Sequence, residues 1–296
     1  MPGHGAEIAK AGPPPPEIKV RIASDGMPLH YRHWLSKETP PRGWLLVLHG
    51  IQSHSGWYEY SGGEFARAGW DVRIPDRRGS GLNTVARGDA CHWKRLAADV
   101  RHFLNDIHHE RQQQGGTGPV LLAGISWGAK LAFLQALQNE RRIHGLTLMT
   151  PGLCPLIRPG PFDRFRLCLA RRLGIEERLV PIPLNDPALF TSLPDQQQNI
   201  AEDPLALHKV NVRFLFADQD LDRECRRPGT VPIPVLLLLA GRDQIIDHDR
   251  TVQFLNNRTR TNLEVRTYPG VAHTLELETC RRDFVRDWMT WAGQFR

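Results

Sequence analysis

The amino-acid sequence predicts an α/β fold in which a mostly parallel central sheet has helices on both faces. The first observation is a series of short, wholly apolar runs, a pattern typical of strands that are covered on both sides. The second is that stretches with helical spacing of apolar residues lie between these runs. Strands that alternate with helices form parallel sheets, because each helix crosses a face of the sheet to return the chain. We therefore expect one sizeable domain with an insertion in this chain of 296 residues.

The expected strands begin with a hairpin. The runs 18–23 and 29–34 are joined by the turn Asp25-Gly26, which predicts an antiparallel edge of the sheet. Further strands are expected at 44–48, 72–74, 120–123, 146–149, 235–239 and 263–268. Apolar residues at helical spacing predict helices at 93–110, 127–137, 251–255 and 280–295.

One long segment, 152–229, interrupts this alternation. It contains many prolines and several amphipathic pieces, and it has no convincing buried strand. A structureless loop of that length would be out of place in a compact domain, so we expect a helical cap over one end of the sheet. The core is then expected at 17–151 and 230–296. Residues 1–16 end in four prolines and are expected to form a disordered N-terminal tail.

Composition excludes several classes of protein. Hydrophobic residues make up 41% and charged residues 24% of the chain, as in an ordinary globular protein. The longest apolar run, 235–240, is far shorter than the about 20 residues of a membrane-spanning helix. The first 17 residues lack the apolar core of a secretory signal, so we expect a cytoplasmic protein.

The charged and sulfur-containing residues exclude further classes. The net charge of +6 comes largely from arginines spread along the chain, without a basic stripe or a known module, so we expect no binding to nucleic acid. The five cysteines are odd in number and lack C-x-x-C spacing. They predict free buried thiols and neither a disulfide framework nor a metal site.

The strongest functional signal is a G-x-S-x-G motif at 124–128, which follows a predicted strand and precedes a predicted helix. At such a sharp turn, Gly124 and Gly128 let backbone segments approach closely, and the hydroxyl of Ser126 is exposed. The first amides of the helix direct their partial positive charge to the same place. We therefore predict that Ser126 is a nucleophile. The alternative is a glycine-rich turn with a serine that caps the helix.

A serine hydroxyl needs a base that removes its proton. Asp243 and His273 each follow a late predicted strand, in the order that this architecture uses after its serine. Open parallel sheets place their catalytic residues at such strand ends. We predict that His273 is the base and Asp243 the acid that orients it. Asp247 and Asp249 are competing acids, which we expect at the exposed start of the next helix.

Two N–H groups must stabilise the oxyanion that forms when the serine attacks. One candidate is the amide of Trp127, directly after the predicted nucleophile. The other lies in the loop after the strand 44–48, which begins with His49 and Gly50. The amide of Ile51 is our candidate there. The alternative is that His49 and Gly50 form only the turn that ends the strand.

A second glycine-rich loop, 76–81, follows the strand 72–74 and contains Arg77 and Arg78. Two arginines in such a loop could hold a phosphate, but the loop has neither the G-x-x-x-x-G-K-[ST] pattern nor the G-x-G-x-x-G pattern. We interpret it as a structural turn beside the active site.

Together these motifs resemble the α/β-hydrolase superfamily, and within it the monoacylglycerol lipase and lysophospholipase branch of the serine aminopeptidase S33 type. The resemblance covers nearly the whole chain from about residue 20, and it rests on 49–50, 54–59, 76–81, 124–128, 241–243 and 272–273. The insertion also resembles the cap of that branch. The resemblance implies a catalytic triad of Ser126, Asp243 and His273, with oxyanion amides from Ile51 and Trp127.

The predicted activity is hydrolysis of carboxylic esters through an acyl-enzyme, with monoacylglycerol or lysophospholipid-like lipid esters as the favoured substrates. This mechanism needs no metal and no organic cofactor. A general short-chain carboxylesterase and a peptidase or amidase with the same triad are alternatives, since fold alone does not determine the substrate. A non-catalytic binding protein would not need all three triad residues. Gln52 is a departure, because family members often have a second glycine there. The oligomeric state stays open.

One expected cap helix, 161–173, has two interpretations. Phe162, Phe165, Leu169 and Leu173 form one helical stripe, and arginines lie between them. The helix either packs on its own domain or makes transient contact with a membrane surface through this stripe.

Overall fold

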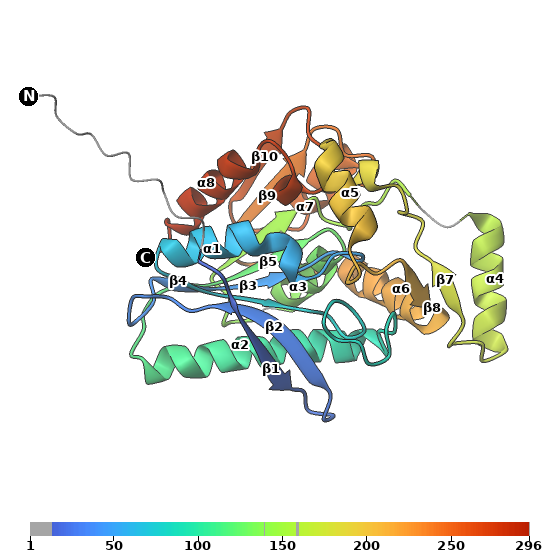
Figure 1. Ribbon diagram of the computed structural model, residues 1–296, viewed down its shortest axis with the longest axis horizontal. Coiled ribbons are helices and arrows are strands. Elements are labelled where there is room, and N and C mark those ends of the chain that lie inside the picture. Colours follow the sequence, from blue (N-terminus) through green and yellow to red (C-terminus); the bar gives the residue numbers. More distant parts are fainter. Residues whose placement is uncertain (1–13, 139, 158–159, 296) are drawn as a thin grey trace, which may run out of the picture.

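The computed structural model describes residues 14–138, 140–157 and 160–295 (Figure 1). Its centre is an eight-stranded sheet with the order β1-β2-β4-β3-β5-β6-β9-β10. The strands are β1 (Glu17–Ile22), β2 (Pro28–Trp34), β3 (Gly43–Leu48), β4 (Trp70–Pro75), β5 (Val120–Ile125), β6 (Gly145–Met149), β9 (Val235–Ala240) and β10 (Leu263–Tyr268). Strands β1 and β2 form the antiparallel edge, and all pairs from β4 to β10 are parallel. The predicted sheet is thus confirmed.

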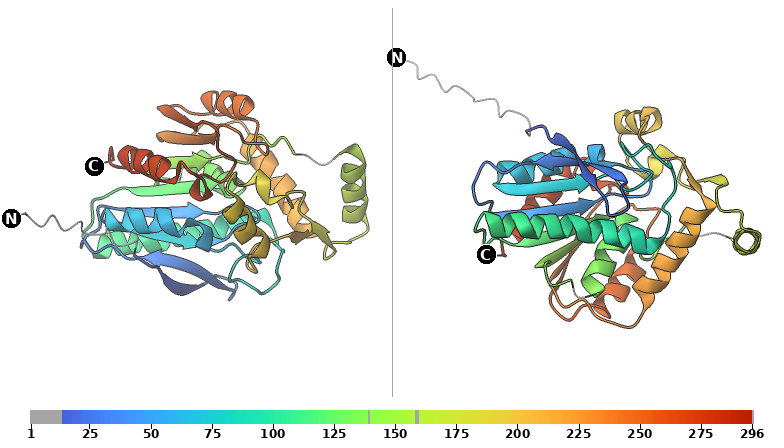
Figure 2. Two further views of the ribbon diagram at one scale, coloured as in Figure 1. Left: turned by 45° about the horizontal axis from the view of Figure 1, so that its top comes forward. Right: turned by 90° about the horizontal axis from the view of Figure 1, so that it is seen from below.

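Helices cover both faces of this sheet, as Figure 1 and Figure 2 show. On one face lie α2 (Trp93–Gln113), α3 (Gly128–Leu137) and α7 (His248–Asn256); on the other lie α1 (Glu59–Arg67) and α8 (Arg281–Ala292). Side chains of β3 alternate between these two cores, because successive residues of a strand point to opposite faces. Every residue of β3, β4, β5, β6 and β9 is buried.

Helix α1 was not expected from the sequence. Its residues EYSGGEFAR include Gly62 and Gly63, and glycine lowers helix propensity. Packing explains why a glycine stands there: a Cβ atom on Gly62 would lie 2.9 Å from the indole of Trp34. The close approach of α1 to β2 therefore requires a residue that weakens the helical sequence pattern.

The segment between β6 and β9 lies beside the end of the sheet where β3 and β5 finish, on the right in Figure 1. It contains α4 (Pro161–Arg172), β7 (Leu179–Pro181), the 3₁₀ turn η2 (Pro187–Leu189), α5 (Pro194–Glu202), β8 (Lys209–Asn211) and α6 (Val212–Arg226). The small antiparallel pair of β7 and β8 was not expected, because strands of three residues leave no recognisable pattern. The division into core and cap remains our interpretation.

At its N-terminal end, the described chain begins at Pro14. Of the expected N-terminal tail, residues 1–13 lie outside the described residues. The carbonyl of Pro14 accepts a hydrogen bond of 2.9 Å from the indole of Trp34, so the chain already contacts the core there. At the other end, the expected helix 280–295 ends earlier, at Ala292. Within the described ranges, every helix is too short or too polar to cross a lipid bilayer.

All five cysteines are free, as predicted. The prediction that they are buried is wrong for two of them. Cys154 and Cys225 are buried, whereas Cys91 and Cys168 are exposed and Cys280 is half-buried. The spacing of cysteines along the chain carries no information about their exposure.

Candidate active site

The G-x-S-x-G motif forms the turn from β5 into α3. Ser126 has a φ of 50°, a left-handed conformation that residues other than glycine rarely adopt. A Cβ atom on Gly124 would lie 2.5 Å from the Cα atom of Ala129, and one on Gly128 would overlap the backbone at the end of β3. Both glycines are therefore required sterically. The turn leaves Ser126 half-exposed at the carboxyl end of β5.

Asp243 and His273 follow β9 and β10, which are neighbouring parallel strands, and the structure brings them together. The Nδ1 atom of His273 donates to Oδ2 of Asp243 at 2.8 Å. The other carboxylate oxygen accepts from the amides of Ile245 at 2.8 Å and Ile246 at 3.1 Å. The side chain of Asp243 is completely buried. His248 lies 3.7 Å from the same oxygen that His273 uses.

The environment keeps Asp243 ionised. Burial by itself would raise the pKa of Asp243, but the adjacent His273 and the hydrogen bonds outweigh it and hold the pKa well below its usual range. An ionised carboxylate only accepts hydrogen bonds, so Nδ1 of His273 carries the proton. Nε2 of His273 is buried and has no hydrogen-bond partner among the described residues. This nitrogen is available to accept a proton from a nucleophile.

The two competing acids, Asp247 and Asp249, lie at the start of α7. Asp247 caps the N-terminus of α7, where its side chain accepts from the amide of Arg250 at 3.0 Å. Asp249 lies in the first turn of the same helix. Carboxylates at these positions stabilise a helix N-terminus. The geometry therefore favours Asp243 as the partner of His273.

The loop after β3 runs beside the serine. A Cβ atom on Gly50 would lie 3.3 Å from Cβ and 3.8 Å from Oγ of Ser126. Among the hydrogen bonds of the described residues, none uses the N–H of Ile51 or of Trp127. The two predicted oxyanion donors are thus on the two loops that flank Ser126, and their N–H groups are available to a ligand.

His49 joins this loop to the loop after β4. Its Nδ1 donates to the carbonyl oxygen of Gly50 at 2.8 Å, and its Nε2 accepts from the amide of Arg77 at 2.9 Å. Burial and the neighbouring Arg77 guanidinium lower the pKa of His49 to about 3. His49 is therefore neutral, and these two contacts fix which nitrogen carries its proton.

On one side of the site, the insertion is tied to the core through Asp203. Its carboxylate accepts from Nε2 of His54 at 2.9 Å and from Nε1 of Trp57 at 2.6 Å. Burial would raise the pKa of Asp203, but these two hydrogen bonds lower it to about 2. Trp57 contacts Phe190 edge-on with centroids 6.0 Å apart, and Phe190 contacts His273 at 6.1 Å. His54 and Asp203 are 149 residues apart in the chain, so the sequence alone did not indicate their contact.

On the other side, α3 and α6 share a buried charged cluster. Nε1 of Trp127 donates to Asp218 at 2.6 Å, and the ammonium of Lys130 lies 2.7 Å from Asp218 and 2.8 Å from Asp222. Burial would lower the pKa of Lys130, but the two carboxylates outweigh it and raise the pKa. The side chain that follows Ser126 is therefore held by a helix of the insertion.

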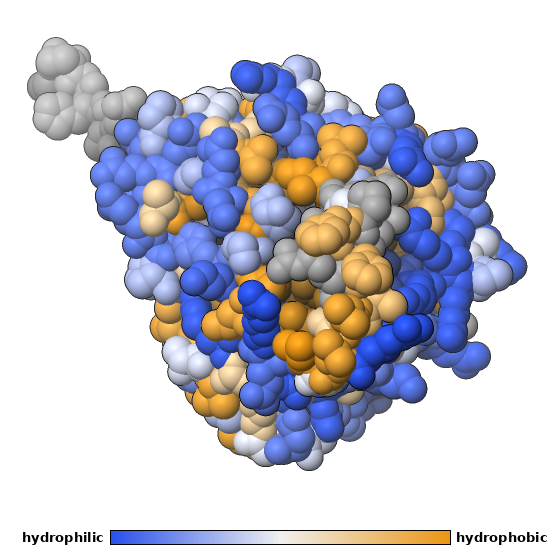
Figure 3. Space-filling model, turned by 90° about the vertical axis from the view of Figure 1, so that its right-hand side faces the viewer, coloured by the Kyte–Doolittle hydropathy of each residue, from blue (hydrophilic) through white to orange (hydrophobic). Residues whose placement is uncertain are grey.

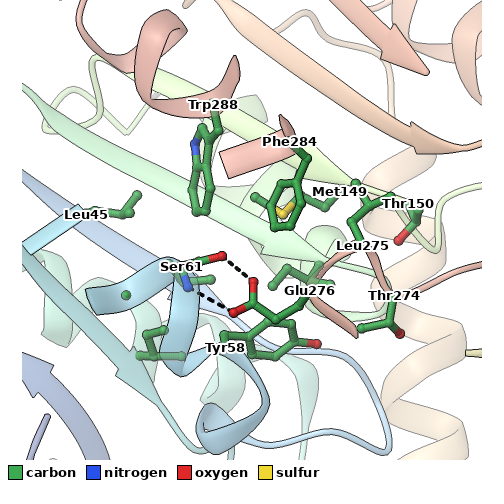
Figure 4. A pocket seen from close by; sticks show the side chains of 14 residues that line it. Leu45, Tyr58, Ser61, Met149, Thr150, Thr274, Leu275, Glu276, Phe284 and Trp288 are labelled. Carbon is green, nitrogen blue, oxygen red and sulfur yellow. Dashed lines mark hydrogen bonds between the residues drawn. The ribbon is translucent and has the colours of Figure 1, made fainter. Parts of the chain in front are cut away.

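A pocket lies behind the turn that follows His273 (Figure 4). Its walls are mostly apolar and include Phe284 and Trp288, but the carboxyl group of Glu276 also faces it. Glu276 accepts hydrogen bonds from the amide of Ser61 at 2.9 Å and from the Ser61 hydroxyl. Burial raises the pKa of Glu276 to about 7. Sequence analysis did not single out this residue.

The described residues contain no group of three or more His, Cys, Asp or Glu side chains that could hold a metal ion.

Comparison with known proteins agrees with this architecture. The model of the family described as serine aminopeptidase, S33, matches residues 39–280. Human monoglyceride lipase is 24% identical over 265 residues, which cover 87% of this chain and 83% of the human protein. Phospholipase YtpA of Bacillus subtilis is 23% identical over 269 residues, which cover 88% of this chain and 99% of that protein.

The same architecture occurs in solved structures. The crystal structure of a soluble variant of monoglyceride lipase from Saccharomyces cerevisiae, in complex with a substrate analogue, superposes with a TM-score of 0.80 at 19% sequence identity. The match covers 95% of this chain and 96% of that one. The chain therefore belongs to the serine aminopeptidase S33 family, has the α/β-hydrolase fold and is a serine hydrolase.

Proposed function

We propose that this chain cleaves monoacylglycerol or lysophospholipid-like lipid esters, with Ser126, His273 and Asp243 as its catalytic triad. The observation that carries the triad is the hydrogen bond of 2.8 Å between buried His273 and Asp243, at the same end of the sheet as the strained turn of Ser126. The similarity to enzymes named monoglyceride lipase and phospholipase supports the substrate class.

The reaction has two halves. Oγ of Ser126 attacks the ester carbonyl while Nε2 of His273 takes its proton, and Asp243 stabilises the imidazolium that forms. The amides of Ile51 and Trp127 donate to the oxyanion. The protonated His273 then gives its proton to the leaving alcohol, and Ser126 keeps the acyl group. Water attacks this acyl-enzyme with His273 as base, and the acid departs as Ser126 regains its proton.

A lipid substrate is also supported by the surface of α4. Phe162, Phe165, Leu169 and Leu173 are 71%, 65%, 45% and 62% exposed. Figure 3 shows a group of apolar residues on this face of the molecule. Helix α4 contacts the rest of the chain through the opposite side, where Leu167 packs with other buried residues. Helix α4 thus packs on its own domain through that opposite side, while the stripe itself faces outward. We propose that the stripe makes transient contact with a lipid surface.

The charges around this stripe are consistent with anionic lipid headgroups. Arg171 and Arg172 lie in the last turn of α4. The side chain of Arg171 remains 51% exposed, although its guanidinium lies 3.6 Å from the carboxylate of Asp220. The side chains at 164 and 166 lie outside the described ones, so the proposal does not rest on them.

The central test is hydrolysis of p-nitrophenyl esters from short to long acyl chains, with monoacylglycerol alongside. We expect a preference for medium or long chains, and we expect Ser126→Ala to lose nearly all turnover while folding normally. The Ser126→Ala variant should also lose labelling by a fluorophosphonate. Added chelator should leave the activity unchanged, because the mechanism requires no metal.

Other results would redirect the proposal. Activity confined to short acyl chains would indicate a general carboxylesterase. Cleavage of amides without Ser126-dependent cleavage of any ester would indicate a peptidase, and no Ser126-dependent turnover at all would favour a binding protein. The cytoplasmic location stays a prediction, which cell fractionation tests.

A further inference from the structure

Arg77, in the loop after β4, has unusual contacts for a guanidinium inside a protein. Among the described residues it has no carboxylate at ion-pair distance; it donates from Nη1 to the carbonyl oxygen of Gly50 at 3.2 Å and from Nη2 to that of Ile51 at 3.0 Å. Its Cζ atom lies 4.8 Å from the ring centroid of Trp127 and 5.3 Å from that of Phe214. One cation therefore contacts both loops that carry the proposed oxyanion donors.

The two arginines of the loop 76–81 differ sharply in this respect. Arg78 forms ion pairs with Asp25, at 2.8 Å, and with Asp99, which satisfy its guanidinium. Arg78 thus has the structural role that we expected for the whole loop. The terminal nitrogens of Arg77 instead donate to backbone carbonyls. The guanidinium groups of both arginines are therefore already engaged and do not form a phosphate site.

Planarity of the peptide bond gives the contact with Gly50 its significance. The carbonyl of Gly50 and the N–H of Ile51 belong to one trans peptide unit, so they point in opposite directions. The carbonyl oxygen accepts from Arg77 and also from Nδ1 of His49, which occupies both of its lone pairs. A glycine at this position has few steric limits on its backbone rotation. By binding this carbonyl, Arg77 and His49 therefore keep the Gly50–Ile51 peptide from rotating, and so fix the direction of the Ile51 N–H.

We propose that Arg77 is a positioning residue for the oxyanion hole, which holds the Gly50–Ile51 peptide in the orientation that offers the Ile51 N–H to the oxyanion and packs against the side chain of Trp127, the second donor. This inference rests on the proposed function, because the oxyanion roles of Ile51 and Trp127 are part of it. A fixed cation behind the two donors also favours the negative charge that develops in the transition state.

The main test compares Arg77→Met with the wild-type chain in ester hydrolysis. Methionine keeps an unbranched apolar stem against Trp127 and removes both hydrogen bonds to the carbonyls. We expect kcat to fall about 10- to 100-fold, less than the roughly 10²- to 10³-fold loss on deleting an oxyanion donor, because the Ile51 N–H is still present; KM should stay nearly constant. Arg77→Lys retains the charge, but a lysine ammonium lacks the forked guanidinium that reaches both carbonyls. Its kcat should therefore lie between that of the wild-type chain and that of Arg77→Met.

A matched control is Arg87→Met. Arg87 is also half-buried and also donates to backbone carbonyls, those of Leu205 at 3.0 Å and Ala206 at 2.9 Å. Among the described residues, none of its hydrogen bonds reaches the loop after β3. Its loss removes the same type of interaction elsewhere, so kcat should remain within about threefold of the wild-type value.

Two inhibitors separate positioning from general loss of structure. An alkyl trifluoromethyl ketone forms a hemiketal when Oγ of Ser126 adds to its carbonyl carbon; the carbonyl oxygen becomes an oxyanion, and the serine proton passes to His273. A glycerol monoether of the same chain length binds without this step. In Arg77→Met we expect the inhibition constant of the ketone to rise by the factor that kcat/KM loses, with that of the ether unchanged.

The outcomes are distinct. Wild-type kcat in Arg77→Met, or equal weakening of ketone and ether, would overturn the inference and leave the proposed function intact. Absence of Ser126-dependent ester hydrolysis in the wild-type chain would remove the proposed function itself. If Arg77→Met does not fold, Arg77→Lys with the same two inhibitors decides the question, and an unchanged ratio of their inhibition constants would overturn the inference.

Discussion

At the scale of a single residue, the charge of Asp243 is the feature that the proposed mechanism uses most directly. Asp243→Asn keeps the shape of the side chain but removes the charge that stabilises the imidazolium, and it allows the wrong tautomer of His273. We expect kcat to fall roughly 10³- to 10⁴-fold, measured with the best p-nitrophenyl ester. The matched control is Asp247→Asn, which alters only the cap of α7 and should keep kcat. A comparable loss in Asp247→Asn would argue against Asp243 as the orienting acid.

Glu276 makes stability depend on pH. Its pKa is about 7 in the folded chain and 4.5 in a model peptide, so unfolding releases a proton between these values. Stability from the neutral carboxyl is therefore present below about pH 4.5 and is lost as pH rises to 7. The side chain of the Glu276→Gln variant stays neutral at both pH values. The free energy of unfolding of this variant, relative to that of the wild-type chain, should therefore increase by about 3 kcal/mol from pH 4.5 to pH 8. Urea unfolding at both pH values measures this, and a difference independent of pH would contradict it.

At the scale of an element, α4 makes a prediction about lipid surfaces. Its exposed stripe would insert apolar side chains among lipid chains, and each fully buried side chain contributes about 1.5–3 kcal/mol. We expect the chain to sediment with anionic vesicles at low salt. The double variant Phe165→Ser, Leu169→Ser should lower the partition coefficient at least tenfold and leave hydrolysis of soluble short esters unchanged.

Strand β1 supplies the matched control. Ile18 and Val20 are 58% and 50% exposed and lie at the far edge of the sheet from the insertion. Serine at these two positions removes a similar apolar area and should leave sedimentation unchanged. No sedimentation of the wild-type chain, or an equal loss in both double variants, would rule out α4 as the lipid-contacting element.

At the scale of the whole molecule, the distribution of cysteines predicts thiol reactivity. In the native protein, exposed Cys91 and Cys168 should react with a thiol reagent quickly. Cys154 is buried and should not react with the reagent. Burial raises the pKa of Cys225 and of Cys280 to about 12, so few of these thiols are present as the reactive thiolate. Counting labelled thiols by mass before and after unfolding tests this, and rapid native labelling of three or more would contradict it. Because all five are free, a reductant should leave the melting temperature unchanged.

Sequence patterns predicted the elements of the sheet well, because a buried strand needs only a short apolar run. The apolar run 235–240, for example, coincides with β9, in which every residue is buried. The elements that were missed lack such a pattern. Helix α1 contains the glycines that its packing against β2 requires, and β7 and β8 are too short to show alternation.

The candidate site likewise has local features that the sequence predicts and long-range contacts that it does not. The turn at Ser126 is a local structure, so its glycines and flanking elements are visible in the sequence, and the strained φ follows from them. Asp243 was predicted from its place after a late strand, and the structure places its carboxylate against His273, with Asp247 at the start of α7. Asp203 contacts His54, and Arg77 contacts Gly50. No spacing of residues along the sequence indicates that these segments lie side by side.

The sequence by itself therefore determined the order of the elements, the class of the sheet and the position of the strained serine, because short-range periodicity and local turn chemistry govern these features. Tertiary structure alone decided that Asp203 bonds to His54, which side of α4 meets solvent, and that Arg77 contacts both loops beside Ser126. The physical reason is that burial and hydrogen-bond partners depend on chain segments that become neighbours only when the sheet has formed.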